Sequence, residues 1–103
     1  MAEVISNISI EEITQSKLPN VDFNNIVFGK QFSDHMFIAD YKDGKWSDLR
    51  IVPFDNFSIS PGCAALHYGQ SVFEGMKAYK NDQQEVLLFR PTDNARRLNI
   101  SAS

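Results

Sequence analysis

The sequence predicts an α+β fold in which a mainly antiparallel sheet is joined to a helix. Two pairs of β-forming runs, each pair divided by a short polar turn, predict the sheet, and a stretch with helical spacing near the C-terminal end predicts the helix. The chain has 103 residues, of which 43% are hydrophobic. This length allows one modest core, so we expect one domain rather than two.

The first predicted hairpin joins residues 35–41 to residues 46–54. Both runs are rich in β-branched and aromatic residues, and Asp43 and Gly44 stand between them. A two-residue hairpin turn needs positive φ angles, which glycine adopts at little steric cost. The pattern therefore predicts two antiparallel strands closed by a tight turn.

A polar connection precedes this hairpin. Residues 16–25 include Pro19 and several asparagines, a composition typical of an extended segment. We therefore expect residues 1–25 to be a loosely ordered lead-in and residues 26–103 to form the small α+β domain.

A second hairpin is predicted further along the chain. Residues 58–62 contain Pro61, which removes a ladder donor, so they predict a loop. Residues 76–79 and 86–89 then flank a polar turn, as the strands of a hairpin do. Because the return strand is apolar at four consecutive positions, we expect it to be buried on both faces.

The last predicted element is a helix that begins after Arg90. Thr92 or Asp93 could accept hydrogen bonds from the free amides of its first turn. Apolar residues then share one face at helical spacing, and no stop signal precedes Ser103. We therefore expect a chain that is truncated within a larger protein. The residues of the shared face are Ala95, Leu98 and Ala102.

Composition and charge exclude several classes of partner. The net charge is −3, and no basic run is longer than the pair Arg96 and Arg97, so a nucleic-acid partner is not expected. No apolar stretch approaches the ~20 residues that a membrane span needs. A secretory leader begins with basic residues, and because none precedes Lys17, a leader is not expected. The single Cys63 cannot form an internal disulfide. We expect a cytoplasmic protein.

No residue pattern indicates a metal site. His35 and His67 are far apart in the sequence, and the lone Cys63 supplies no zinc spacing. Both histidines are expected to be ordinary core or turn residues.

One segment, residues 66–79, combines aromatics, two glycines and a glutamate between a predicted loop and strand, as pocket walls often do. On composition alone its aromatics would be core residues. The segment closely resembles the small-domain signature of branched-chain amino acid aminotransferases, which are class IV, fold-type IV pyridoxal-phosphate enzymes. Three further motifs of the family occur in the expected order, and together the matches extend from about Val27 to the end of the chain. They are Phe28-Gly29 with residues 32–36, Ser60-Pro61-Gly62, and residues 88–91 with Asn94, Arg97, Ser101 and Ala102.

The resemblance implies pyridoxal 5'-phosphate as cofactor and assigns its phosphate to Arg97. A guanidinium is a rigid, permanently charged fork that can pair two phosphate oxygens, whereas Arg96 is the better candidate for a solvated surface residue. Phe28, Tyr68 and Phe73 match residues of the substrate pocket. In this family the tyrosine position can serve the neighbouring subunit, so the resemblance also implies a homodimer.

No catalytic residue is expected within this chain. The family lysine that forms the Schiff base with the cofactor belongs to a later region, and Lys77 matches an exposed strand residue instead. Glu74 is expected to be a structural hydrogen-bonding residue.

The implied activity of the parent enzyme is transamination of leucine, isoleucine and valine with 2-oxoglutarate, and this fragment alone is expected to be inactive. Two rivals within the class remain, a D-amino acid aminotransferase and an aminodeoxychorismate lyase, although the form of the 68–79 signature argues against both. A non-enzymatic α+β binding module is the alternative outside the class.

Overall fold

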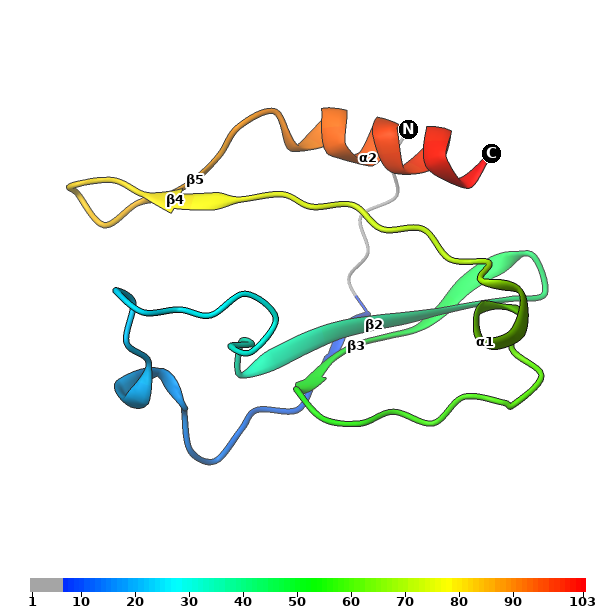
Figure 1. The fold of residues 1–103 in the computed structure, drawn as a ribbon, viewed down its shortest axis with the longest axis horizontal. Coiled ribbons are helices and arrows are strands. Elements are labelled where there is room, and N and C mark those ends of the chain that lie inside the picture. The colour runs from blue at the N-terminus through cyan, green and yellow to red at the C-terminus, as the bar shows by residue number, and fades with distance from the viewer. Residues whose placement is uncertain (1–6) are drawn as a thin grey trace. The chain divides into compact units, whose positions relative to one another are not determined.

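A computed structural model describes residues 7–103 and confirms the α+β class. The chain divides into two compact units, one ending at Phe57 and the other beginning at Ser58, and each is described by itself. The first unit contains β1 (Ser9–Ile10), the 3-10 helix η1 (Leu18–Asn20), β2 (His35–Lys42) and β3 (Lys45–Pro53). The second contains α1 (Ala64–Tyr68), β4 (Ala78–Lys80), β5 (Val86–Leu88) and α2 (Pro91–Ala102), as Figure 1 shows.

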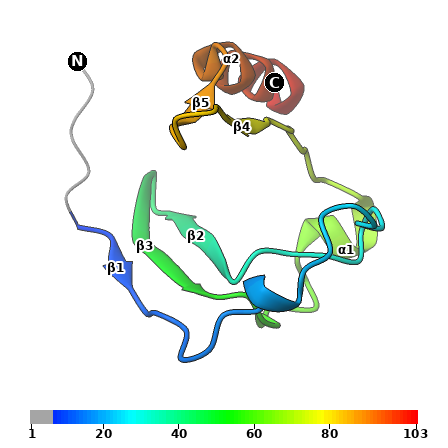
Figure 2. The same cartoon turned by 90° about the vertical axis from the view of Figure 1, so that its left-hand side faces the viewer.

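A three-stranded sheet in the order β1-β3-β2 forms the first unit. β2 and β3 are antiparallel, and their pairing runs from His35 opposite Pro53 to Lys42 opposite Lys45. The turn residues Asp43 and Gly44 have φ angles of 53° and 79°, which confirms the predicted hairpin turn. The short β1 pairs with β3 in parallel, a contact that the sequence did not predict (Figure 2).

Part of the expected lead-in has defined contacts. Ser16 Oγ donates a 2.6 Å hydrogen bond to one carboxylate oxygen of Asp34, and the Lys17 amide donates a 2.9 Å bond to the other. These bonds, first that from Ser16 and then that from Lys17, lower the pKa of Asp34. Residues 1–6 of the expected lead-in lie outside the described residues, and the domain boundary at residue 26 stays a prediction.

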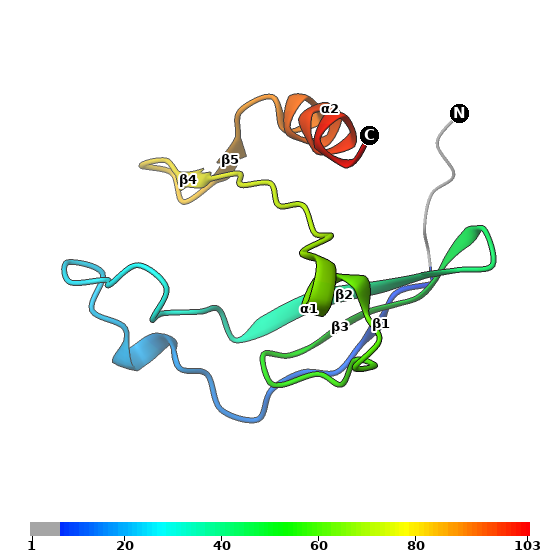
Figure 3. The ribbon, with the colours of Figure 1, turned by 45° about the vertical axis from the view of Figure 1, so that its right-hand side comes forward.

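The second unit contains the predicted second hairpin. β4 and β5 are antiparallel, with Ala78 opposite Leu88 and Lys80 opposite Val86, and α2 follows β5 (Figure 3). The expectation that the return strand is buried on both faces is wrong, because all three residues of β5 are exposed. A two-stranded hairpin buries a face only when a second layer covers it, and no such layer lies on β5 within its own unit.

The helix begins where the sequence predicted, but not with the predicted cap. Pro91 is its first residue, a position at which the missing N–H of proline costs nothing. The residue before it, Arg90, adopts a left-handed conformation with φ 47°, and no side chain caps the helix. Asp93 is not the cap, because it lies in the first turn of the helix rather than before it, and its carboxylate pairs with Arg90 and Arg96. The short helix α1, which ends at Tyr68 and is followed by Gly69 with φ 65°, was not predicted.

The expected core is not formed within residues 7–103. No described residue falls in the buried class, and Phe28 is fully exposed. In the same range, no helix has the length and apolar character needed to cross a membrane.

The Gly44→Ala substitution tests the hairpin turn. A side chain at φ 79° is strained, so we expect the β2–β3 hairpin to lose about 1 kcal/mol of stability, measured by hydrogen exchange of its amides. Gly75→Ala is the matched control, because Gly75 has no positive φ and an added Cβ there meets no heavy atom within 4 Å. Equal effects of the two substitutions would contradict the assigned turn.

Candidate functional site

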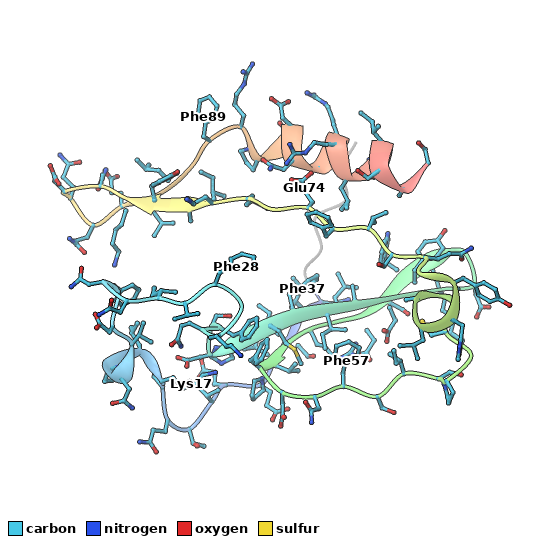
Figure 4. All side chains as sticks on the ribbon, in the orientation of Figure 1. Lys17, Phe28, Phe37, Phe57, Glu74 and Phe89 are labelled. Carbon is cyan, nitrogen blue, oxygen red and sulfur yellow. The ribbon has the colours of Figure 1, made fainter. Side chains whose placement is uncertain are left out.

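The candidate site lies between α2 and the segment that precedes β4. Asn94 and Arg97 are three residues apart on α2, so their side chains project from the same face of the helix. Arg97 donates from Nε to Oε1 of Glu74 at 2.7 Å and from Nη2 to Oε2 at 2.5 Å. Figure 4 shows Glu74 on the segment beside α2. The two groups form a fork-shaped, bidentate ion pair, the strong form of this interaction.

Two further donors hold the Glu74 carboxylate. Asn94 donates from Nδ2 to Oε2 at 3.1 Å, and the backbone amide of Gly75 donates to the same oxygen at 2.9 Å. The Asn94 amide also donates to the carbonyl oxygen of Gly75 at 2.8 Å. An ionised carboxylate accepts about four hydrogen bonds. Glu74, whose side chain is only 10% exposed, is therefore fully hydrogen-bonded where it lies.

These bonds fix the charge state of the pair. The hydrogen bonds from Arg97 and then from Asn94 lower the pKa of Glu74 from 4.5 to about 2. The same pairing with Glu74 raises the pKa of Arg97. Both groups are therefore ionised at neutral pH.

The guanidinium of Arg97 keeps donors for a ligand. It has five N–H donors, and within residues 7–103 its hydrogen bonds use Nε and Nη2, not Nη1. The Arg97 side chain is 68% exposed. It borders a shallow hollow of about 290 Å³ whose other lining residues are Phe89, Arg90, Asp93 and Asn94. An anion could therefore reach the free edge of this guanidinium.

Neighbouring charges leave the site slightly positive. Asp93 pairs with Arg96 at 2.9 Å and with Arg90 at 3.5 Å, while Arg97 pairs with Glu74. Three arginines thus face two carboxylates, a net charge of +1. This balance favours an anionic ligand over a cationic one.

The three predicted pocket residues are exposed aromatics. Tyr68 is the last residue of α1 and is 80% exposed, and Phe73, directly before Glu74, is 90% exposed. Phe28 belongs to the first unit, where it precedes Gly29 in a turn closed by a hydrogen bond from the Lys30 amide to the Val27 carbonyl. None of the three lines a hollow described for its own unit.

The sequence predicted Arg97 as a phosphate-binding residue, which stays a prediction, but it did not predict the group of residues that contact Arg97. Glu74 was expected to be a hydrogen-bonding residue, and that is confirmed, but its partners were not predicted. Asn94 was noted only as part of a motif. The spacing of Asn94 and Arg97 on one helix face was the signal available in the sequence. Nothing local indicated that both would contact a residue about 20 positions earlier.

Known proteins resemble most of this chain. It is 50% identical to branched-chain-amino-acid aminotransferase 2 of Bacillus subtilis (strain 168) over 91 residues. These residues are 87% of the chain and 25% of that relative. It is 45% identical over 84 residues to the branched-chain-amino-acid aminotransferase of Helicobacter pylori (strain J99), covering 82% of the chain and 25% of the relative. The chain is homologous to a segment of branched-chain-amino-acid aminotransferases.

This homology confirms the resemblance found in the motifs. Branched-chain-amino-acid transaminase 1 of B. subtilis (strain 168) is a further relative, at 47% identity over 81 residues, which are 78% of the chain and 23% of the relative. No protein-family model matches the chain. The chain spans about a quarter of the length of these aminotransferases.

Titration of Glu74 tests the site. Its pKa in the folded protein, about 2, lies below the ordinary value of 4.5. The ion pair should therefore favour folding fully above pH 4.5 and lose this contribution as the pH falls toward 2. A carboxyl carbon NMR titration should place the midpoint near 2 in this protein and higher in Asn94→Ala, which removes one donor. A midpoint near 4.5 in the unsubstituted protein would contradict the pairing.

Proposed function

We propose that this chain is the part of a pyridoxal-phosphate-dependent branched-chain amino acid transaminase that grips the cofactor phosphate and supplies pocket wall. The exposed Arg97 guanidinium, which Glu74 holds on one edge and whose Nη1 makes no hydrogen bond within residues 7–103, is the observation that carries the proposal. The homology to branched-chain aminotransferases supports it. The proposed substrates are leucine, isoleucine and valine, with 2-oxoglutarate as the amino acceptor.

The residues present fit a phosphate group. An arginine fork suits two phosphate oxygens, and the surrounding charges sum to +1, so a dianionic phosphate is attracted rather than repelled. Arg97 would hold the phosphate through the donors that Glu74 does not use. When bound, pyridoxal phosphate supplies the electron sink for the amino acid carbon.

The work of this chain is binding and orientation. Arg97 would hold the phosphate end of the cofactor, and this grip would limit the positions open to the rest of the group. We assign the substrate side-chain wall to Phe28, Tyr68 and Phe73, whose exposed rings can cover an aliphatic side chain. An apolar wall discriminates by only ~1 to 3 kcal/mol per methylene, so it should accept all three branched substrates.

We further propose that the active protein is a cytoplasmic homodimer. Tyr68 is 80% exposed at the end of α1, as expected of a residue that serves the site of a neighbouring subunit. The lone Cys63 fits a reducing compartment. Residues 26–103 are proposed to form one α+β domain only together with further polypeptide, because neither unit encloses a core within the described residues.

The Arg97→Ala substitution in the full-length enzyme tests the phosphate assignment. Charge-assisted hydrogen bonds contribute ≈ 1.5 to 3 kcal/mol, so affinity for pyridoxal phosphate should fall roughly 10- to 100-fold, measured by absorbance titration of the apoenzyme. Arg96→Ala is the matched control, because the 76% exposed Arg96 pairs with Asp93 rather than Glu74. Its effect should stay within about twofold. Equal losses in the two variants would refute the assignment.

The 103-residue chain alone should show no transaminase turnover. No residue within it is assigned to proton transfer, and the cofactor by itself is a poor catalyst without an orienting site. The measurement is incubation with leucine, 2-oxoglutarate and pyridoxal phosphate, compared with the cofactor alone. Turnover above that background would overturn the assignment of a binding role only.

A further inference from the structure

We propose that Glu74 is a positioning residue that acts through Arg97. Its carboxylate, anchored by Asn94 and Gly75, holds one edge of the guanidinium and thereby presents the Nη1 edge to the cofactor phosphate. This inference rests on the proposed function, in which Arg97 binds that phosphate. It adds a role for Glu74 beyond that of a structural hydrogen-bonding residue.

Glu74 is the fixed partner of the pair. Its side chain is 10% exposed, whereas that of Arg97 is 68% exposed. Asn94 and the Gly75 amide hold the carboxylate independently of Arg97, at 3.1 and 2.9 Å. A largely covered acid whose orientation is already set can fix a long, exposed side chain that would otherwise sample many rotamers.

The guanidinium divides its donors between two tasks. Nε and Nη2 bind Glu74, and this planar contact sets the plane and direction of the whole group. The remaining N–H donors then point in a fixed direction, so phosphate binding costs little further rotamer entropy of the side chain. A lysine at position 97 offers a point charge without a second rigid edge, so it could not be positioned in this way.

The negative charge of Glu74 also offsets the positive charge of Arg97, and this offset by itself would weaken the attraction of the site for phosphate. The orientation effect should outweigh this loss. The guanidinium is largely exposed, so solvent screens the charge, while an untethered arginine must give up rotamer freedom when the phosphate binds. Removal of the Glu74 charge should therefore weaken phosphate binding rather than strengthen it.

The experiment compares two cofactors on the full-length enzyme. Glu74→Gln keeps the size of the side chain but removes the anion that holds Arg97. Affinity for pyridoxal phosphate should fall about tenfold, equivalent to about 1.4 kcal/mol, and affinity for pyridoxal, which lacks the phosphate, should change by less than about twofold. Glu85→Gln is the matched control, because Glu85 pairs with Asn81 in the turn between β4 and β5.

A double-mutant cycle separates positioning from structure. If Glu74 acts through Arg97, Glu74→Gln should have no further effect on pyridoxal phosphate binding in the Arg97→Ala background. Additive losses, or equal losses for both cofactors, would show a structural role and overturn the inference. If Arg97→Ala itself weakens both cofactors equally, the proposed function fails. If Arg97→Ala weakens binding of pyridoxal phosphate more than binding of pyridoxal, but Glu74→Gln does not, the proposed function stands and only the positioning role of Glu74 fails.

Asn94→Ala decides the matter if Glu74→Gln does not fold. It removes the 3.1 Å bond to the Glu74 carboxylate and the 2.8 Å bond to the Gly75 carbonyl, while leaving the carboxylate charge in place. A smaller loss of the same kind, seen with pyridoxal phosphate and not with pyridoxal, supports the inference. An equal effect on both cofactors, or no effect on either, overturns it.

Discussion

The bidentate contact between Glu74 and Arg97 is the constraint on which the second unit depends. α2 has few contacts with the strands of its unit, and no residue of the helix is buried. Hydrogen bonds from Asn94 and Arg97 to Glu74 and Gly75 join it to the segment before β4. In the absence of a packed apolar face, directional polar bonds locate the helix. The Arg97 guanidinium therefore both holds the helix in place and is the group proposed to bind phosphate.

The size of the chain gives a physical explanation for the absence of buried residues among residues 7–103. It spans about a quarter of the length of its relatives, and small segments bury a low fraction of their apolar surface. Large apolar side chains such as Phe37, Phe57 and Phe89 are more than half exposed. Apolar surface on this scale is what a larger fold covers. This agrees with the proposal that the chain functions only within a longer polypeptide.

The proposed site combines opposing electrostatic effects. An acid beside a phosphate-binding arginine lowers the net attraction, yet it also gives the guanidinium a defined direction. Arg90 and Arg96 share Asp93, so the site keeps a net positive charge despite the two carboxylates. Specific recognition of a phosphate oxygen depends on aimed donors more than on total charge.

Local sequence patterns predicted the two hairpins, the C-terminal helix and the resemblance to branched-chain aminotransferases. The Asp43-Gly44 turn, the two hairpins and the helix start at Pro91 follow from backbone preferences that act over a few residues, and the ordered motifs indicated branched-chain aminotransferases. Which groups distant in sequence contact each other could be seen only in the folded structure. The pairing of β1 with β3 and the contact of Glu74 with Arg97, 23 positions apart, are examples. Periodicity fixes which face a side chain occupies, but not what covers that face, and for this reason the predicted burial of β5 was wrong.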